Sequence, residues 1–351
     1  MAWKSTDELA PAGRRAAAAR DGADEGRPSG DGRPGIAPDA AGRFESLAAT
    51  VGRTPVVEIR PDETAGARIL VKTEGANPTG SIKDRACVAL FRELLRDPEW
   101  SAGKTVLDAS SGNMGCSLAY FGRLLGIPTR IVASSRLTPE KRFFMEYFGA
   151  AVETVGDFTI EGNRFARSVA AAEPGRWYFM DQLHNPVNVQ AHFAGTGPEV
   201  LAQVPGVAAV VGSVGTGGTL LGTGRFLKQV DARIAVVAVE AASGTRIPGT
   251  ASLADGDYRS PFIAAGCEEG VFDTSIPIAE EQAAQTARAL LDMGVFGGLQ
   301  TGAVVAAARE FARRNDVRGD VVAIAGDSGW KNGAALRDKV LRPARSDGER
   351  L

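Results

Sequence analysis

From residue 43 onward, short apolar and β-branched runs alternate with longer stretches in which apolar residues recur every three or four positions. The short runs predict strands, and the longer stretches predict amphipathic helices. The predicted strands are residues 68–74, 104–110, 129–134, 151–155, 207–213, 233–240 and 320–327. The predicted helices are residues 115–126, 139–149, 280–294 and 302–315, each ending near a glycine or an asparagine. This alternation predicts an α/β fold with mostly parallel strands.

Residues 1–42 break the pattern. They are dominated by Gly, Ala, Pro, Arg and Asp and contain almost no large side chain that folding would bury. Such a segment cannot offset the entropy lost on ordering, so we expect a disordered tail. The whole chain has 351 residues, which is enough for two domains that share a cleft.

The charge is nearly balanced, with 40 basic and 42 acidic side chains. Nothing in this balance indicates a nucleic-acid or an anionic-membrane partner. No apolar run approaches the roughly 20 residues that span a bilayer, and the N-terminus lacks the apolar segment of an export signal. We therefore expect a soluble, cytoplasmic protein with no membrane partner.

The cysteines and histidines do not indicate a metal site. Cys87, Cys116 and Cys267 lie far apart, so neither a disulfide framework nor a CxxC site is expected. His184 and His192 have no cluster of Cys or Glu around them. Metal catalysis and a Ser-His-Asp triad therefore both lose support.

Three polar, glycine-containing turns each follow a predicted strand: SSGNMG (110–115), GTGGTLLG (215–222) and GDSGW (326–330). In open α/β sheets, ligands bind at the carboxyl ends of strands, where such turns lie. We therefore expect all three turns to face one cleft.

The turn at 215–222 is suited to an anion. Gly215, Gly217 and Gly218 let the backbone approach a phosphate closely, and Thr216 and Thr219 add hydroxyl donors. The GxxxxGK[ST] pattern of a P-loop is absent. Taken alone, the turn fits a phosphate site and tight packing about equally well.

The other two turns also allow two interpretations. Ser110, Ser111 and Asn113 are donors for a carboxylate or a ring hydroxyl, or they cap the following helix. Asp327 and Ser328 end an apolar strand, where they meet a ligand or form an ordinary exit from the strand. In isolation, each of these turns fits the structural role better.

A lysine, Lys83, follows the turn-rich stretch NPTG (77–80) and precedes an apolar, helix-like segment. It is a solvated charge, a phosphate contact or a nucleophile. A buried lysine has a lowered pKa, so that its amine can act as a nucleophile and carry a proton.

Together, these stretches resemble the fold type II pyridoxal phosphate enzymes, and specifically their cysteine synthase branch. The similarity runs over about residues 45–335 and includes VGRTPVVEI (51–59), NPTGSIKDR (77–85), QLHNPVNVQAHFAGTGPEV (182–200) and MGVFGGLQTGAVVAAA (293–308). It implies two doubly wound α/β domains with pyridoxal 5'-phosphate in the cleft between them. The implied larger, phosphate-binding domain is 43–76 plus 188–340, the smaller, mobile, substrate-binding domain is 77–187, and 341–351 is a tail.

The resemblance also implies roles for individual residues. Lys83 looks like the lysine that bonds the cofactor, Asn113 like the partner of the ring hydroxyl, and Ser328 like the partner of the ring nitrogen. The implied phosphate cradle is Gly215, Thr216, Gly217, Gly218 and Thr219. The implied substrate-binding set is Ser110, Ser111, Gly112, Asn113, Met114, Gln182 and Arg246.

The implied activity is β-replacement on an O-activated L-serine through an aminoacrylate, with a small amino acid as substrate and a homodimer as the assembly. The nucleophile stays open between sulfide, a thiocarboxylated sulfur-carrier protein and an amine. Formation of a nonprotein β-substituted alanine, such as a 2,3-diaminopropionate precursor, is one alternative. A serine or threonine dehydratase is another, although GTGGT is typical of cysteine synthases.

Two features depart from the usual cysteine synthase pattern. Met114 replaces the usual threonine, as in the siderophore-type synthases, and GLQTGA (298–303) replaces GISSGA. The chain is most similar to two subfamilies, the siderophore-type synthases and the synthases that use a thiocarboxylated sulfur-carrier protein. Both use O-phosphoserine, which favours that donor over O-acetylserine. Arg246 is either a phosphate partner or a solvated arginine.

Overall fold

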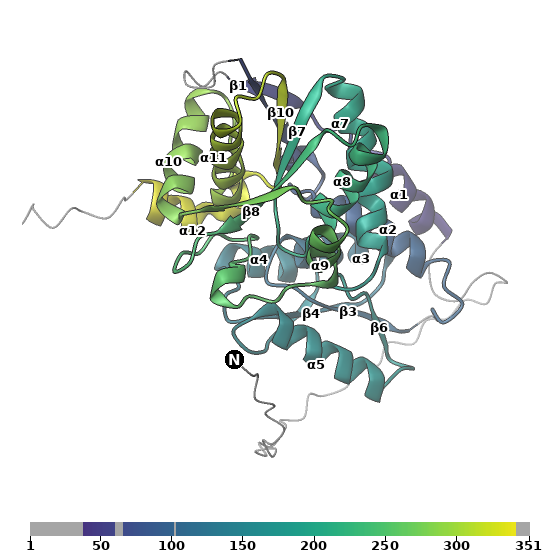
Figure 1. Cartoon of the computed structure of the whole chain (residues 1–351). Helices are drawn as coiled ribbons and strands as arrows, with labels where there is room; N and C mark the ends of the chain where they lie inside the picture. Colours follow the sequence, from purple (N-terminus) through teal and green to yellow (C-terminus); the bar gives the residue numbers. More distant parts are fainter. Residues whose placement is uncertain (1–37, 60–65, 102, 342–351) are drawn as a thin grey trace, which may run out of the picture. The chain divides into compact units, whose positions relative to one another are not determined.

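The computed structural model describes residues 38–59, 66–101 and 103–341. They form two sheets flanked by helices (Figure 1). In spatial order, the six-stranded sheet contains β1 (Val56–Ile59), β2 (Arg68–Thr73), β10 (Asp320–Ala325), β7 (Val207–Ser213), β8 (Ala235–Ala241) and β9 (Thr274–Ile278). The four-stranded sheet contains β5 (Ala151–Thr154), β4 (Thr129–Ala133), β3 (Thr105–Ala109) and β6 (Trp177–Phe179). All pairs are parallel except β1 with β2.

Helices connect these strands. The α-helices are α1 (Pro38–Ala48), α2 (Lys83–Leu94), α3 (Asn113–Leu125), α4 (Pro139–Tyr147), α5 (Thr159–Ala172), α6 (Val187–Ala191), α7 (Gly197–Gln203), α8 (Gly218–Val230), α9 (Pro261–Glu268), α10 (Glu280–Asp292), α11 (Leu299–Arg314) and α12 (Gly333–Ala335). The 3-10 turns are η1 (Glu74–Ala76), η3 (Leu253–Asp255) and η4 (Gly329–Asn332), and the π-helical turns are η2 (His192–Thr196) and η5 (Leu336–Leu341).

The larger sheet separates two hydrophobic cores because successive side chains of a strand point to opposite faces. In β10, Val321 and Ala323 pack with the core that α10 and α11 cover, whereas Val322 and Ile324 pack with the core that contains residues of α7 and α8. Figure 1 shows α10 and α11 on one side of β10 and β7, with α7 and α8 on the other. A sheet buried on both faces explains why its strands are continuous apolar runs.

The smaller sheet is built in the same way. Val106 and Ile131 pack with residues of α2 and α3, whereas Leu107 and Val132 pack with α5 and Trp177. The prediction of two doubly wound sheets is therefore confirmed.

All seven predicted strands and all four predicted helices are present, with ends shifted by at most a few residues. The sequence did not predict β1, β6 and β9, which are edge strands of their sheets. An edge strand has one neighbour and is covered less completely, so its sequence does not need a long apolar run.

The N-terminal boundary needs correction. Residues 38–42 were assigned to the tail and 43–48 to the larger domain, but all of them lie in α1. Ala40, Phe44 and Ala48 recur every fourth position and are buried, and the Phe44 ring meets those of Phe91 and Phe121 edge-on. Helix α1 therefore packs on the core of the smaller sheet. The rest of the predicted tail, residues 1–37, and residues 342–351 lie outside the described residues.

Within the described residues, no helix is long and apolar enough to cross a membrane.

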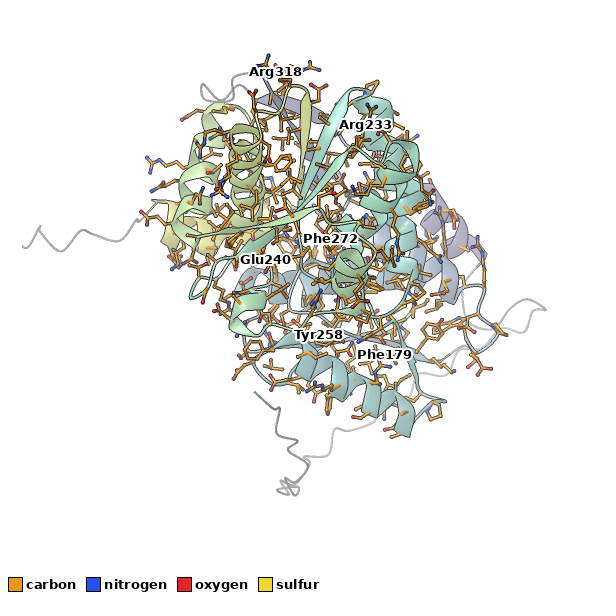
Figure 2. The ribbon with its side chains drawn as sticks, viewed as in Figure 1. Phe179, Arg233, Glu240, Tyr258, Phe272 and Arg318 are labelled. Atoms are coloured by element: carbon orange, nitrogen blue, oxygen red, sulfur yellow. The ribbon has the colours of Figure 1, made fainter. Side chains whose placement is uncertain are left out.

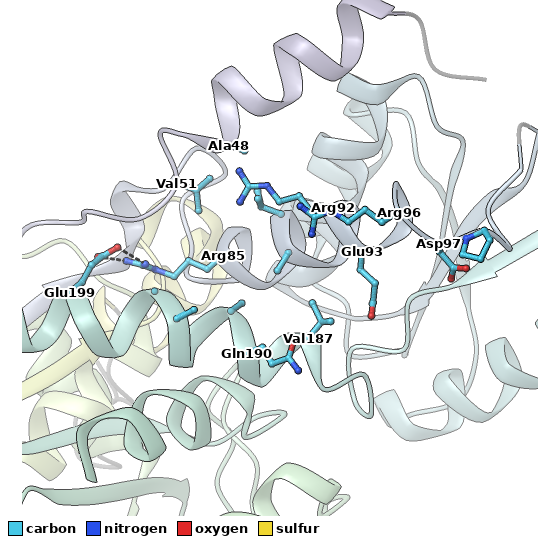
Figure 3. A pocket seen from close by; sticks show the side chains of 16 residues that line it. Ala48, Val51, Arg85, Arg92, Glu93, Arg96, Asp97, Val187, Gln190 and Glu199 are labelled. Atoms are coloured by element: carbon cyan, nitrogen blue, oxygen red, sulfur yellow. Dashed lines mark hydrogen bonds and ion pairs between the residues drawn. The ribbon is translucent and has the colours of Figure 1, made fainter. Parts of the chain in front are cut away.

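A buried ionic network joins α2 to the larger sheet and to α7. The Arg85 guanidinium donates to both carboxylate oxygens of Glu74 at 2.7 and 2.9 Å, and to those of Glu199 at 2.8 and 2.7 Å. Burial alone would raise the pKa of Glu199, but these hydrogen bonds hold it at about 2. The network lies at one end of a cavity of about 730 Å³ between α1, α2 and α6, which none of the predicted site residues lines (Figure 3).

We predict that Arg85→Gln lowers the free energy of unfolding by about 3–5 kcal/mol, because, among the described residues, it leaves Lys72 as the one buried cation beside the two carboxylates of Glu74 and Glu199. Urea-induced unfolding measures the change. Arg92→Gln is the matched control on the same helix, since its ion pair with Glu45 is solvent-exposed and should contribute at most about 1 kcal/mol. Equal effects of the two substitutions would contradict a structural role for the buried network.

Candidate active site

A cavity of about 640 Å³ lies at the carboxyl ends of strands from both sheets. All predicted site residues line it except Gly218 and Ser328. The turns after β3 and β7 therefore face one cavity, as expected. Of the turn after β10, Gly326 lines the cavity, whereas Asp327 and Ser328 do not.

Lys83 is the first residue of α2 and lines the cavity. The turn before it is fixed, because Ile82 N donates to Gly326 O at 2.9 Å and Gly80 takes a φ of +80°. The next residue, Asp84, is fully buried and accepts hydrogen bonds from Thr79 and Ser117. Burial lowers the pKa of Lys83 from 10.5 to about 8. A large fraction of this amine is therefore neutral near physiological pH and available as a nucleophile or base.

The glycine turn leads from β7 into α8 and leaves little space for side chains. Gly217 has a φ of +82°, and a Cβ built on it would lie 2.7 Å from Ile263 Cγ1 and 2.9 Å from Ile263 N. A Cβ on Gly215 would lie 2.8 Å from Gly249 O. Among the described residues, no hydrogen bond uses the backbone N–H of Gly215, Thr216 or Gly217. These donors and the start of α8 form an anion-binding geometry.

Buried side chains of His192 and Asn188 contact this turn. His192 Nε2 lies 3.1 Å from Thr219 Oγ1, and burial, together with the charges of Lys83 and Arg85, holds the pKa of His192 well below its usual value. Asn188 Nδ2 lies 3.3 Å from Thr216 Oγ1. Gly218 does not line the cavity, but a Cβ there would lie 2.6 Å from Asn188 Oδ1, so its lack of a side chain allows this close packing.

The turn after β3 combines the two roles that the sequence left open. Ser110 Oγ accepts from Gly112 N and Gly115 N at the start of α3, which is a capping role. Asn113 Nδ2 donates to Asp327 Oδ2 at 2.9 Å, while Asn113 Oδ1 is buried without a hydrogen-bond partner. Gln182 lines the same wall and donates to Ala109 O at 2.8 Å. The buried, unpaired oxygen of Asn113 is an acceptor that a ligand in the cavity could satisfy.

Ser328, the proposed partner of the ring nitrogen, does not line the cavity. Its backbone N donates to Gly80 O, and its Cβ lies 2.9 Å from where a Cβ on Gly75 would be. Its side chain therefore packs against the turn that precedes Lys83. The sequence could not show this, because the orientation depends on the pairing of Ser81 with Asp327.

The cavity residues that were not predicted include Gln300, Tyr258 and Arg136. Gln300 Nε2 donates to Ser213 Oγ at 2.6 Å and to Gly249 O at 3.1 Å, and its Oε1 lies 2.5 Å from where a Cβ on Gly326 would be. GLQTGA (298–303) stands where cysteine synthases usually have GISSGA. This difference is the sequence feature that could have identified Gln300 as a site residue.

Two arginines lie at the cavity wall, one from each sheet. Arg136 follows β4, and Arg246 follows β8. Burial and then the charge of Arg136 lower the pKa of Arg246. Arg136 Nη1 lies 3.9 Å from Asp257 Oδ1, and its guanidinium lies over the Phe158 ring at 3.9 Å. The carboxylates of Asp257 and Glu280 lie near Arg246 and offset part of this positive charge, while the two guanidinium groups supply donors for an anionic ligand.

The residues present fit pyridoxal 5'-phosphate, the cofactor that the resemblance implies. A glycine turn with free N–H groups, a half-buried lysine of lowered pKa and an unpaired asparagine oxygen share one cavity. Within residues 38–59, 66–101 and 103–341, no group of three or more His, Cys, Asp or Glu could hold a metal ion.

Comparisons with known proteins agree with this geometry. The family described as "Pyridoxal-phosphate dependent enzyme" matches residues 47–327. Cysteine synthase B of Salmonella typhimurium is 34% identical over 277 residues, which cover 77% of this chain and 88% of that protein. Cysteine synthase of Aquifex aeolicus is 32% identical, with 82% and 90% covered. The solved structure of O-ureido-L-serine synthase has a TM-score of 0.75 at 26% identity and covers 86% of this chain and 96% of that one.

We predict that Gly217→Ala weakens binding of pyridoxal phosphate by at least about 10-fold, because an alanine with positive φ would also collide with the Ile263 backbone. Titration of the apoprotein, followed by absorbance, measures the dissociation constant. Gly175→Ala is the control, because a Cβ there meets nothing within 4 Å. Unchanged affinity in Gly217→Ala would contradict the phosphate-binding role of the turn.

We also predict that the reactivity of Lys83 in the apoprotein rises with pH through a midpoint near 8 rather than near 10.5, because only the neutral amine reacts. Brief labelling with acetic anhydride at a series of pH values, followed by peptide mass spectrometry, measures this midpoint. A Lys83→Ala sample identifies the peptide. A midpoint near 10.5 would show that the amine is not desolvated.

Proposed function

The chain belongs to the pyridoxal-phosphate dependent enzymes and is of the cysteine synthase type, and from this premise we propose that its substrate for β-replacement is O-phospho-L-serine. The observation that carries the choice of donor is the pair of arginines at the cavity wall, Arg136 and Arg246. A phosphate ester carries nearly two negative charges, which two guanidinium groups bind strongly, whereas an acetyl ester carries none.

The proposed roles of the other residues follow from chemistry. Bound pyridoxal phosphate supplies an electron sink for negative charge at the substrate Cα. Lys83 would hold the cofactor covalently, and its amine would remove the Cα proton and later deliver a solvent-exchanged proton to Cα. The turn from Gly215 to Thr219 holds the phosphate of the cofactor. Asn113 Oδ1 accepts from the ring hydroxyl.

The donors of Ser110, Ser111, Gly112 and Asn113, together with Gln182, hold the substrate carboxylate. Ser328 stays the proposed partner of the ring nitrogen, as the resemblance implies, while the Gln300 amide lies beside Gly326 at the end of β10. These assignments orient Cα towards Lys83 and the β-substituent towards the two arginines.

Cysteine is one product of such a replacement, and a nonprotein β-substituted alanine is the second candidate. Met114 favours the second, because it brings a thioether to the cavity wall where cysteine synthases have a hydroxyl. The similarity to O-ureido-L-serine synthase shows that this fold also serves products other than cysteine. The homodimer, the sulfur-carrier partner and the cytoplasmic location stay predictions.

We predict that Arg246→Gln lowers kcat/KM for O-phospho-L-serine by about 10- to 100-fold and changes that for O-acetyl-L-serine by less than about 3-fold, because only the phosphate ester loses a charged hydrogen bond. Holoenzyme is assayed with each donor and excess sulfide, and the product is identified by mass.

Arg233→Gln is the control, since Arg233 is 91% exposed in the loop between α8 and β8 (Figure 2). A wild-type preference for O-acetyl-L-serine, or an equal loss with both donors in Arg246→Gln, would contradict the choice of donor.

A further inference from the structure

A chain of three hydrogen-bonded side chains leads out of the candidate active site. Tyr258 lines the cavity, and its hydroxyl lies 2.8 Å from His184 Nε2. His184 Nδ1 lies 2.8 Å from Asp181 Oδ1. Neither His184 nor Asp181 lines the cavity, and the side chain of His184 is 27% exposed. The chain therefore connects the cavity to solvent through an ionisable ring.

The two sheets each contribute part of this chain. Tyr258 lies in the loop between η3 and α9, which belongs to the larger sheet, whereas Asp181 and His184 lie in the connection between β6 and α6. The loop is held firmly: Ser260 Oγ donates to Thr216 O at 2.5 Å, and Ser252 N donates to Asp257 Oδ2 at 2.9 Å. Tyr258 is labelled in Figure 2.

The partners of Asp181 determine the direction of the hydrogen bonds. Asn163 Nδ2 donates to Oδ1 at 2.9 Å, and Arg167 Nη2 donates to Oδ2 at 2.5 Å, as expected for an ionised carboxylate. We assign a proton to His184 Nδ1, because its contact with the accepting Asp181 carboxylate at 2.8 Å is shorter than the 3.1 Å contact with Arg167 Nη2, which would need an unprotonated Nδ1. Nε2 of the neutral ring is then an acceptor, and the Tyr258 hydroxyl donates to it.

We propose that Tyr258 is a catalytic residue that deprotonates the incoming nucleophile, with His184 and Asp181 as positioning residues. The proposal rests on the proposed function, because it requires a nucleophile that enters the cavity. As the nucleophile's lone pair forms the bond to Cβ, its S–H or N–H bond breaks and the proton moves to the phenol oxygen. The original Tyr258 proton moves to His184 Nε2, and the part-exposed ring then releases a proton to water.

A second base is needed at this stage because Lys83 delivers a proton to Cα in the same half of the reaction. General bases typically accelerate such steps by about 10²- to 10⁴-fold. The relay is complete only while the loop of Tyr258 and the smaller sheet are in contact. Closure around the substrate would therefore also assemble the base for the nucleophile.

The test uses holoenzyme and Tyr258→Phe, which keeps the ring and removes the hydroxyl. O-phospho-L-serine is added first, and the absorbance change of the bound cofactor gives the rate of the first half-reaction, which we expect to stay within about 3-fold of wild type. Either 2-mercaptoethanol, a neutral thiol near neutral pH, or thioacetate, already an anion, is then added. We expect a rate about 100-fold lower with 2-mercaptoethanol and within about 3-fold of wild type with thioacetate.

Tyr147→Phe is the matched control, since this tyrosine is 70% exposed on α4 and does not line the cavity. An equal loss with both thiols, or no loss with either, would overturn the proposal. Failure of wild-type holoenzyme to show any absorbance change with O-phospho-L-serine or O-acetyl-L-serine would instead contradict the proposed function.

A second measurement does not depend on the nucleophile. The chain has two histidines, so ¹⁵N labelling of histidine gives a spectrum with two rings to assign. We expect His184 to carry its proton on Nδ1, and its Nε2 resonance to move in Tyr258→Phe, with His184→Gln providing the assignment. A proton on Nε2 in the wild-type protein would overturn the proposed relay.

Discussion

Burial of one amine, that of Lys83, is the constraint on which the rest of the site depends. A lysine removed from water favours its neutral form, and here burial is the cause of the lowered pKa. Holding an amine in that position requires a rigid backbone on both sides. The antiparallel bridge between Ser81 and Asp327 holds one side, and the hydrogen bonds of Asp84 to Thr79 and Ser117 hold the other. The buried Arg85 network then fixes α2 against the larger sheet.

The second constraint is topological. Parallel strands place their carboxyl ends along one edge, and two doubly wound sheets whose edges face each other leave a cavity between two sets of polar turns. The larger sheet contributes the glycine turn, Arg246 and Tyr258, and the smaller contributes Asn113, Arg136 and Gln182. A ligand in the cavity therefore contacts both sheets, which explains why binding and closure are coupled in the proposed relay.

The parts of the site that could be predicted from sequence are those in which one local segment determines both conformation and chemistry. Lys83 and the turn at 215–219 are of this kind, because turn residues and a following helix specify the geometry locally. Gln300, Tyr258 and Arg136 come from connections whose positions depend on how distant elements pack. The position of Ser328 outside the cavity lining has the same cause, since it depends on contacts with residues that precede it by more than 200 positions. The edge strands and α1 were missed because their apolar patterns are short. Such patterns identify a strand or a helix only when the elements that pack against them are known.

The central claim is that the protein replaces the β-substituent of a serine ester by removing the Cα proton, which then exchanges with solvent, and by later delivering a proton from solvent to Cα. Running the reaction of O-phospho-L-serine with sulfide in D₂O, and locating deuterium in the product by NMR, tests it most directly. The account predicts an amino acid with the nucleophile on Cβ, deuterium at Cα and none at Cβ. Retention of the original Cα proton would indicate direct displacement, and pyruvate with a deuterated methyl group would indicate a lyase. Either result would contradict the account.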